Sequence, residues 1–144
     1  MAETLVLAIG TRKGLFVAHG SKGRKKFALH GPFGAGVAVY SALIDTRGSG
    51  RLYASSCNAF FGMKVLVSRD MGKKFKETAS APAFPKDDGR ALANIWALEA
   101  GADKKEILAG VEPASLFRST DGGDEWECLF DSLPPIHCVK VAAV

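Results

Sequence analysis

The chain has little of the chemistry that marks common cofactor, metal and redox sites. It contains three cysteines, Cys57, Cys128 and Cys138. This is an odd number without metal-site spacing, so we expect reduced thiols, as in a cytoplasmic protein. The sequence also lacks a P-loop, a dinucleotide-binding fingerprint and any cluster of cysteine and histidine. We therefore expect no cofactor and no metal ion.

Long apolar segments and a strong charge excess are missing too. The first four residues carry an acid and no basic residue, and only Leu5–Ile9 follow as an apolar run, so neither a signal peptide nor a membrane span is expected. The net charge of +4 on 144 residues is too small to indicate nucleic-acid binding. The basic run 22–26 has no interleaved aromatic residues, and we interpret it as a solvated hairpin turn. These features predict a cytoplasmic protein that binds neither nucleic acid nor membrane.

What the sequence does have is a turn motif that occurs twice, at 68–75 and 119–126, between apolar segments. Its form is Ser-x-Asp-x-Gly-x-x-aromatic, and the matching residues are Ser68, Asp70, Gly72, Phe75 and Ser119, Asp121, Gly123, Trp126. Serine and aspartate side chains can hydrogen-bond the backbone of their own turn. Glycine allows the positive φ of a tight hairpin, and the aromatic ring can pack under the returning strand. The motif therefore predicts two β-hairpins with a structural turn.

These two segments resemble Asp-boxes, the bacterial neuraminidase repeats of sialidase-like β-propellers. The resemblance implies an all-β fold of blades with four antiparallel strands, A to D, and an Asp-box at each C–D turn. It covers nearly the whole chain, as the beginning and end of the family's longer members without their middle blades. Sialidase chemistry is not expected, because the family's early Arg-Ile-Pro motif is absent and neither Tyr40 nor Tyr53 has an assigned carboxylate partner.

The blades follow from the alternation of apolar segments and turns. Residues 5–18 read as a hairpin, and Val37–Ile44 reads as a strand. Residues 91–102 would also suit a short helix, but their alignment with the strand at Val39–Ala42 favours a strand. We expect one partial propeller domain over 1–144. Its blade one spans about 5–30 plus 137–143, blade two about 37–78, and blade three about 92–130, with 137–143 as the missing inner strand of blade one.

The resemblance places a functional mouth on the face opposite the Asp-boxes, where B–C and D–A loops gather. We expect Arg12, Asn58 and Glu112 to converge there, and the candidate ligand-binding residues are Arg12, Asn58, Arg90, Glu112 and His137. The alternative is that these are solvated loop residues. One functional hypothesis is a non-catalytic module that binds a small ligand or a protein partner. The other is a glycoside-hydrolase-like enzyme that uses Glu112 and Asp88, for which a carboxylate pair about 5–10 Å apart would be needed.

The number of blades also bears on assembly. Propellers close with about 4–8 blades, and this chain supplies three. Its end blades would expose apolar side chains, so we expect a homodimer that forms a six-bladed ring. The strand 137–143 would complete blade one either of its own chain or of the partner.

Overall fold

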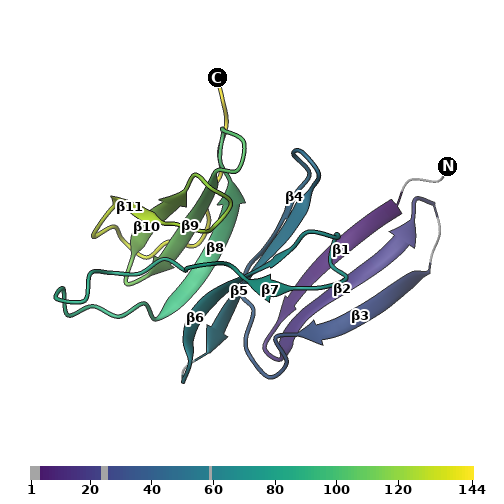
Figure 1. The fold of residues 1–144 in the computed structure, drawn as a ribbon, viewed down its shortest axis with the longest axis horizontal. Coiled ribbons are helices and arrows are strands. Elements are labelled where there is room, and N and C mark those ends of the chain that lie inside the picture. The colour runs from purple at the N-terminus through teal and green to yellow at the C-terminus, as the bar shows by residue number, and fades with distance from the viewer. Residues whose placement is uncertain (1–3, 24–25, 59) are drawn as a thin grey trace.

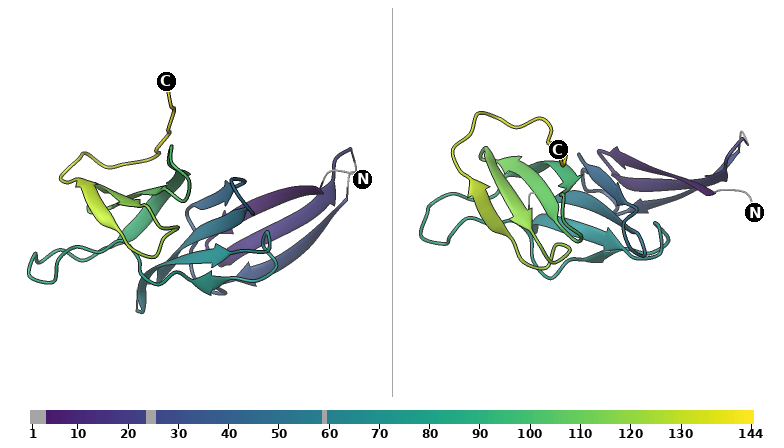
Figure 2. Two further views of the ribbon diagram at one scale, coloured as in Figure 1. Left: turned by 45° about the horizontal axis from the view of Figure 1, so that its top comes forward. Right: turned by 90° about the horizontal axis from the view of Figure 1, so that it is seen from above.

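The computed structural model describes residues 4–23, 26–58 and 60–144 (Figure 1). The described part of the chain is all-β: it contains strands and turns and no helix. The strands form three antiparallel sheets that follow one another along the chain. The sheets lie beside one another without closing into a ring, and the two ends of the chain lie apart (Figures 1 and 2). The all-β prediction is confirmed.

The first sheet has three strands in the order β1–β2–β3. They are β1 (Thr4–Thr11), β2 (Gly14–Ser21) and β3 (Phe27–Phe33). Arg12 and Lys13 form the short turn from β1 to β2, and Gly14 follows at a φ of 129°. The hairpin predicted for residues 5–18 is present. Part of the predicted basic turn, residues 24 and 25, lies outside the described residues.

The second sheet has the order β4–β5–β6–β7. Its strands are β4 (Ala42–Asp45), β5 (Arg51–Asn58), β6 (Gly62–Ser68) and β7 (Lys76–Glu77). The inner strand begins later than Val37, where the sequence predicted it. Before β4 a single bridge joins Ala38 to Cys57, and the Ser55 hydroxyl accepts the Ser41 N–H at 3.2 Å. The Ser55 side chain thus accepts a hydrogen bond that a backbone carbonyl group would accept in a regular β-ladder.

The third sheet repeats this plan with the order β8–β9–β10–β11. Its strands are β8 (Asn94–Ala100), β9 (Ile107–Glu112), β10 (Ser115–Ser119) and β11 (Glu127–Phe130). β8 occupies the stretch whose residue types also suited a helix, so the choice of a strand is confirmed. Tertiary pairing with β9 outweighs the weak local helix preference of its alanines and leucine.

Two apolar cores hold the sheets together. One lies between the second and third sheets and includes the fully buried side chains of Tyr53, Ile95 and Ile107. The other lies between the first and second sheets and includes Leu15 and Leu52. The first and third sheets therefore pack on opposite sides of the second.

A half-buried ion pair, Asp45–Arg47, also links the second sheet to the third. The Arg47 guanidinium donates Nε–H to Asp45 Oδ1 at 2.8 Å and Nη2–H to Asp45 Oδ2 at 2.9 Å. The same guanidinium donates to the carbonyl oxygens of Gly101, at 2.8 Å, and Glu106, at 3.0 Å, in the β8–β9 loop. One side chain thus links the β4–β5 loop to the neighbouring sheet.

The predicted strand over 137–143 is wrong for the single chain. These residues pair with none of the three sheets. They continue from Ile136, which packs over Gly110 on the outer face of the third sheet, and Lys140 Nζ lies 3.2 Å from Glu99 Oε2 of β8. The reason is geometric, because the second sheet lies between this segment and β1.

Among the described residues, no helix is long and apolar enough to cross a membrane.

Candidate functional site

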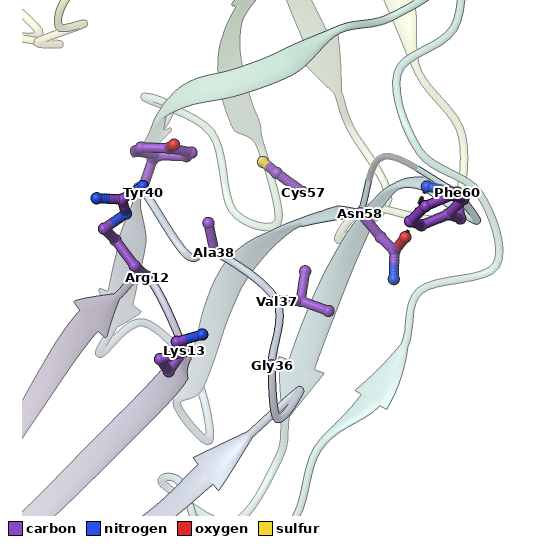
Figure 3. Close-up of a pocket in the computed structure, with 9 residues that line it drawn as sticks. All are labelled: Arg12, Lys13, Gly36, Val37, Ala38, Tyr40, Cys57, Asn58 and Phe60. Atoms are coloured by element: carbon purple, nitrogen blue, oxygen red, sulfur yellow. Dashed lines mark hydrogen bonds between the residues drawn. The ribbon is translucent and has the colours of Figure 1, made fainter.

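A candidate site lies where the β1–β2 and β5–β6 turns approach each other. It is a pocket of about 540 Å³, within the usual range for small-molecule sites. Arg12 and Tyr40 lie along one side of it, and Asn58 and Phe60 lie along the other (Figure 3). The remaining lining residues are Lys13, Gly36, Val37, Ala38 and Cys57.

Two cationic side chains of this pocket, those of Arg12 and Lys13, project from the β1–β2 turn. Neither the Arg12 guanidinium nor the Lys13 ammonium makes a hydrogen bond or an ion pair with any of the described residues. The turn itself is held by the Thr11 hydroxyl, which donates to the Gly14 carbonyl at 2.7 Å and accepts the Lys13 N–H at 3.1 Å. Because the backbone is fixed while both cations are free, the turn presents positive charge to a ligand.

The opposite wall is shaped by Asn58. Its side-chain oxygen accepts the N–H groups of Phe60, at 2.8 Å, and Phe61, at 3.0 Å. These two bonds fix the tip of the hairpin, on which the Phe60 side chain is 94% exposed. An exposed aromatic ring across the pocket from two cations can stack on a flat or sugar-like part of a ligand whose anionic group the cations bind.

A second, smaller pocket adjoins the first through Tyr40. It has a volume of about 280 Å³ and is lined by Tyr40, Trp96, Glu112, Pro135, Ile136 and His137. The Tyr40 and Trp96 rings meet edge to face, with 4.9 Å between their centroids. Of the predicted site residues, Arg12 and Asn58 therefore share one pocket, while Glu112 and His137 share the next. Tyr40 belongs to both.

Arg90 and Asp88 line neither of these two pockets. The Arg90 guanidinium donates to Asp88 Oδ2 at 2.7 Å and to Asp131 Oδ2 at 2.9 Å, and it stacks 4.2 Å over the Phe84 ring. This guanidinium holds the pKa of Asp88 and Asp131 below the ordinary value of a carboxyl group. A ligand at Arg90 would have to displace both carboxylates. Asp88 is held ionised, so it is poorly suited to act as an acid.

The Cys57 thiol faces the first pocket but is not a reactive group. It donates to Asn94 Oδ1 at 2.6 Å, and burial raises its pKa. A raised pKa keeps the thiol protonated at neutral pH, and the thiolate is the nucleophilic form. Cys57 therefore contributes shape rather than chemistry to the pocket.

The two Ser-x-Asp turns form the same hydrogen-bond pattern. The Ser68 hydroxyl donates to Asp70 and accepts the Gly72 N–H, both at 2.8 Å. Asp70 Oδ1 accepts the N–H groups of Lys73 and Lys74. In the other turn Ser119 and Asp121 make the equivalent four bonds, at 2.8–3.0 Å. Both aspartates are used within their own turns, which fits a structural role.

Lys13 and Phe60 belong to the loops that the sequence placed at the mouth, but they and Tyr40 were not among the candidate ligand-binding residues. The repeat does align Tyr40 with Trp96, and that alignment was the available signal for their contact. Whether Lys13 has a partner depends on side-chain packing, which no motif records. Comparison with known proteins adds no relative: no protein-family model matches the chain, and no curated protein matches it.

Proposed function

We propose that the chain is a non-catalytic module of Asp-box β-propeller type, with the three sheets as its blades. We further propose that it binds a small anionic ligand in the pocket between Arg12 and Asn58. The observation that carries the ligand proposal is the pair of unpartnered cations, Arg12 and Lys13, in a pocket of about 540 Å³. The repeated turn bonds and the two four-stranded sheets with equivalent strand order support the blade assignment.

Binding is favoured over glycoside hydrolysis by the distribution of carboxylates. The larger pocket has no acidic residue in its lining. Glu112 lines the smaller pocket without Asp88, which is paired with Arg90. Hydrolysis with a carboxylate pair needs both groups on either side of one bond. A pocket of basic, amide and aromatic groups instead suits recognition of a carboxylate or phosphate attached to an apolar or sugar-like body.

The test compares glucuronate with glucose, because the two differ by one carboxylate. Isothermal titration of the 144-residue chain should give heat of binding for glucuronate and a much weaker or absent response for glucose. Arg12→Ala and Lys13→Ala should each weaken glucuronate binding about tenfold or more, the effect of losing roughly 1.5–3 kcal/mol of charge-assisted hydrogen bonding.

Lys86→Ala is the matched control, because it removes an exposed lysine that lines neither pocket. It should leave the affinity unchanged. Inorganic phosphate is a second probe that carries charge without a sugar ring. If neither glucuronate nor phosphate binds, or if Arg12→Ala binds as well as the parent chain, the proposed ligand class is wrong.

A further inference from the structure

The first sheet lacks a strand that the other two sheets have: its first strand, β1, has no strand on its outer side among the described residues. In the second sheet β5 pairs with β4 on one side and β6 on the other, and in the third sheet β9 pairs with β8 and β10. The equivalent strand β1 forms a ladder with β2 alone. The end of β1 is closed by Val39 of the same chain, whose N–H donates to the Thr11 carbonyl oxygen at 2.8 Å, so the open part of the edge is the part that begins at Leu5. The eight residues of β1 include no charge and no proline, and its ladder with β2 has no bulge. Exposed edges normally carry such features because they prevent unwanted pairing, so this edge is built to be covered.

An apolar face accompanies the open edge. Leu5, Leu7 and Ile9 alternate along β1 on one face of the sheet, and Phe27 and Leu29 of β3 lie on the same face through the register of the ladders. Their exposed fractions range from 37% for Leu5 to 60% for Leu29. Contiguous apolar side chains of this size mark an interface.

A groove also runs beside the start of this edge. It has a volume of about 480 Å³, and its walls include Leu5 and Val6 of β1 and Ile44 of β4. His19 of β2 and Asp70, Met71 and Lys73 of the 68–75 turn also form its walls, so the groove separates the start of β1 from the second sheet. An extended segment paired with the start of β1 would meet the apolar side chains of Leu5, Val6 and Ile44 there.

The chain itself supplies a segment of this kind. Residues 137–143, His-Cys-Val-Lys-Val-Ala-Ala, are rich in β-forming and small apolar residues yet pair with no strand. They begin directly after Ile136, which is fixed over Gly110 of the third sheet. The segment has the same length as β8, the inner strand of the third sheet, which has 7 residues.

From these observations we propose that residues 137–143 of one copy pair with the β1 edge of a second copy. Within one chain the first and third sheets lie on opposite sides of the second, so the segment would have to cross β4 to reach its own β1. Two copies related by a two-fold axis place the third sheet of each against the apolar face of the other's first sheet. The segment then passes directly to the partner, and both open edges are covered in a closed dimer.

The first test is the solution mass of the chain, measured by light scattering under reducing conditions. The expected mass is twice 15.2 kDa. Val139→Pro should give the single-chain mass, because proline cannot donate a ladder hydrogen bond. Val144→Pro, just outside the pairing segment, is the control and should stay dimeric. Circular dichroism of Val139→Pro should retain the β signal, since residues 137–143 belong to no sheet of their own chain.

Disulfide trapping distinguishes exchange between copies from closure within one chain, and it does not depend on Val139→Pro folding. A cysteine scan of β1, from Leu5→Cys to Ile9→Cys one at a time in a Cys128→Ser background, is oxidised against the native Cys138. A covalent dimer at particular β1 positions, and not in the unscanned background, is expected. A covalently closed monomer, a folded soluble monomer of the parent chain, or no cross-link at any β1 position would each overturn the proposal. The test is independent of ligand binding.

Discussion

The Tyr53 hydroxyl donates to the carbonyl oxygen of Gly122, 3.0 Å away, across the boundary between the second and third sheets. Gly122 lies in the 119–126 turn, so this turn is bound to the preceding sheet. The 68–75 turn has an equivalent contact, because His19 Nε2 of the first sheet lies 2.7 Å from the carbonyl oxygen of Met71. Met71 and Gly122 occupy the same position in the repeated motif. The repeated turns therefore join each sheet to the sheet before it.

Tyr53→Phe should lower the free energy of unfolding by about 0.5–1.5 kcal/mol, the net value of a typical hydrogen bond. Tyr53 is fully buried, and its ring contacts would remain. Tyr40→Phe is the control, because Tyr40 is exposed and has no hydrogen bond among the described residues. Urea unfolding of both variants measures the difference. Equal stability of Tyr53→Phe and the parent chain would mean that the contact does not hold the turn.

Asp121→Ala should cost about 0.5–2 kcal/mol, the range for losing a side-chain cap of a turn. The Asp121 carboxylate accepts two backbone N–H groups and the Ser119 hydroxyl. It lines neither the Arg12 pocket nor the Glu112 pocket, so ligand affinity should be unchanged. The melting temperature measures the loss of stability, and titration with glucuronate measures whether the affinity has changed. Lost affinity at unchanged stability would assign the residue to binding instead.

Gly72→Ala should be much more destabilising than Gly89→Ala. Both glycines have positive φ, 94° and 82°, so both substitutions carry a conformational cost of about 1–2 kcal/mol. A Cβ atom at Gly72 would also lie 2.6 Å from Val17 Cγ1, whereas one at Gly89 meets nothing within 4 Å. The difference between the two variants in urea unfolding isolates the packing of the 68–75 turn on β2. Equal destabilisation would show that this turn can shift away from Val17 without cost.

Stability should fall steeply in acid through the Asp45–Arg47 pair. Hydrogen bonds from the Arg47 side chain depress the pKa of Asp45 below its ordinary value of 3.8. The stabilisation is thus complete at pH values well above 3.8 and is lost as pH falls through the lower pKa of the folded state. Asp45→Asn should be less stable at pH 7 by about 1.5–3 kcal/mol, and its stability should change less between pH 4 and pH 2. If Asp45→Asn and the parent chain lost the same free energy of unfolding between pH 4 and pH 2, Asp45 would not contribute to the acid response.

The fold was predictable where the sequence repeats itself. Residues 91–102 suit a helix by local preference, and only their alignment with the strand predicted at 39–42 identified β8. The segment 137–143 shows the limit of this reasoning. Its residue types predict a strand, but a strand also needs a partner edge, and the position of β1 relative to the third sheet follows from packing that a linear pattern does not record.

The candidate site was predictable only in part for a similar reason. Arg12 and Asn58 lie in one pocket, because Arg12 follows β1 and Asn58 ends β5, and the hairpin turns after these two strands approach each other. Arg90 also follows a turn, but its guanidinium is held by Asp88 and by Asp131, which is 41 residues later in the chain. A motif gives residue types and spacing and cannot show which cations are neutralised by distant carboxylates. Lys13, which was not among the candidate ligand-binding residues, makes no ion pair with any residue that the structure describes.

Ile136 lies against the backbone of Gly110 because glycine leaves room for its side chain: a Cβ atom there would come within 2.7 Å of the isoleucine methyl group. This anchor sets the point from which the C-terminal segment can move. Ile136 can stay packed on Gly110 while residues 137–143, which pair with no strand of their own chain, join or leave an edge of a second copy, so the core between the second and third sheets need not open. Subunits joined through this segment would exchange at the rate at which a short peptide separates from the β1 edge. This separation is faster than the global unfolding of the chain.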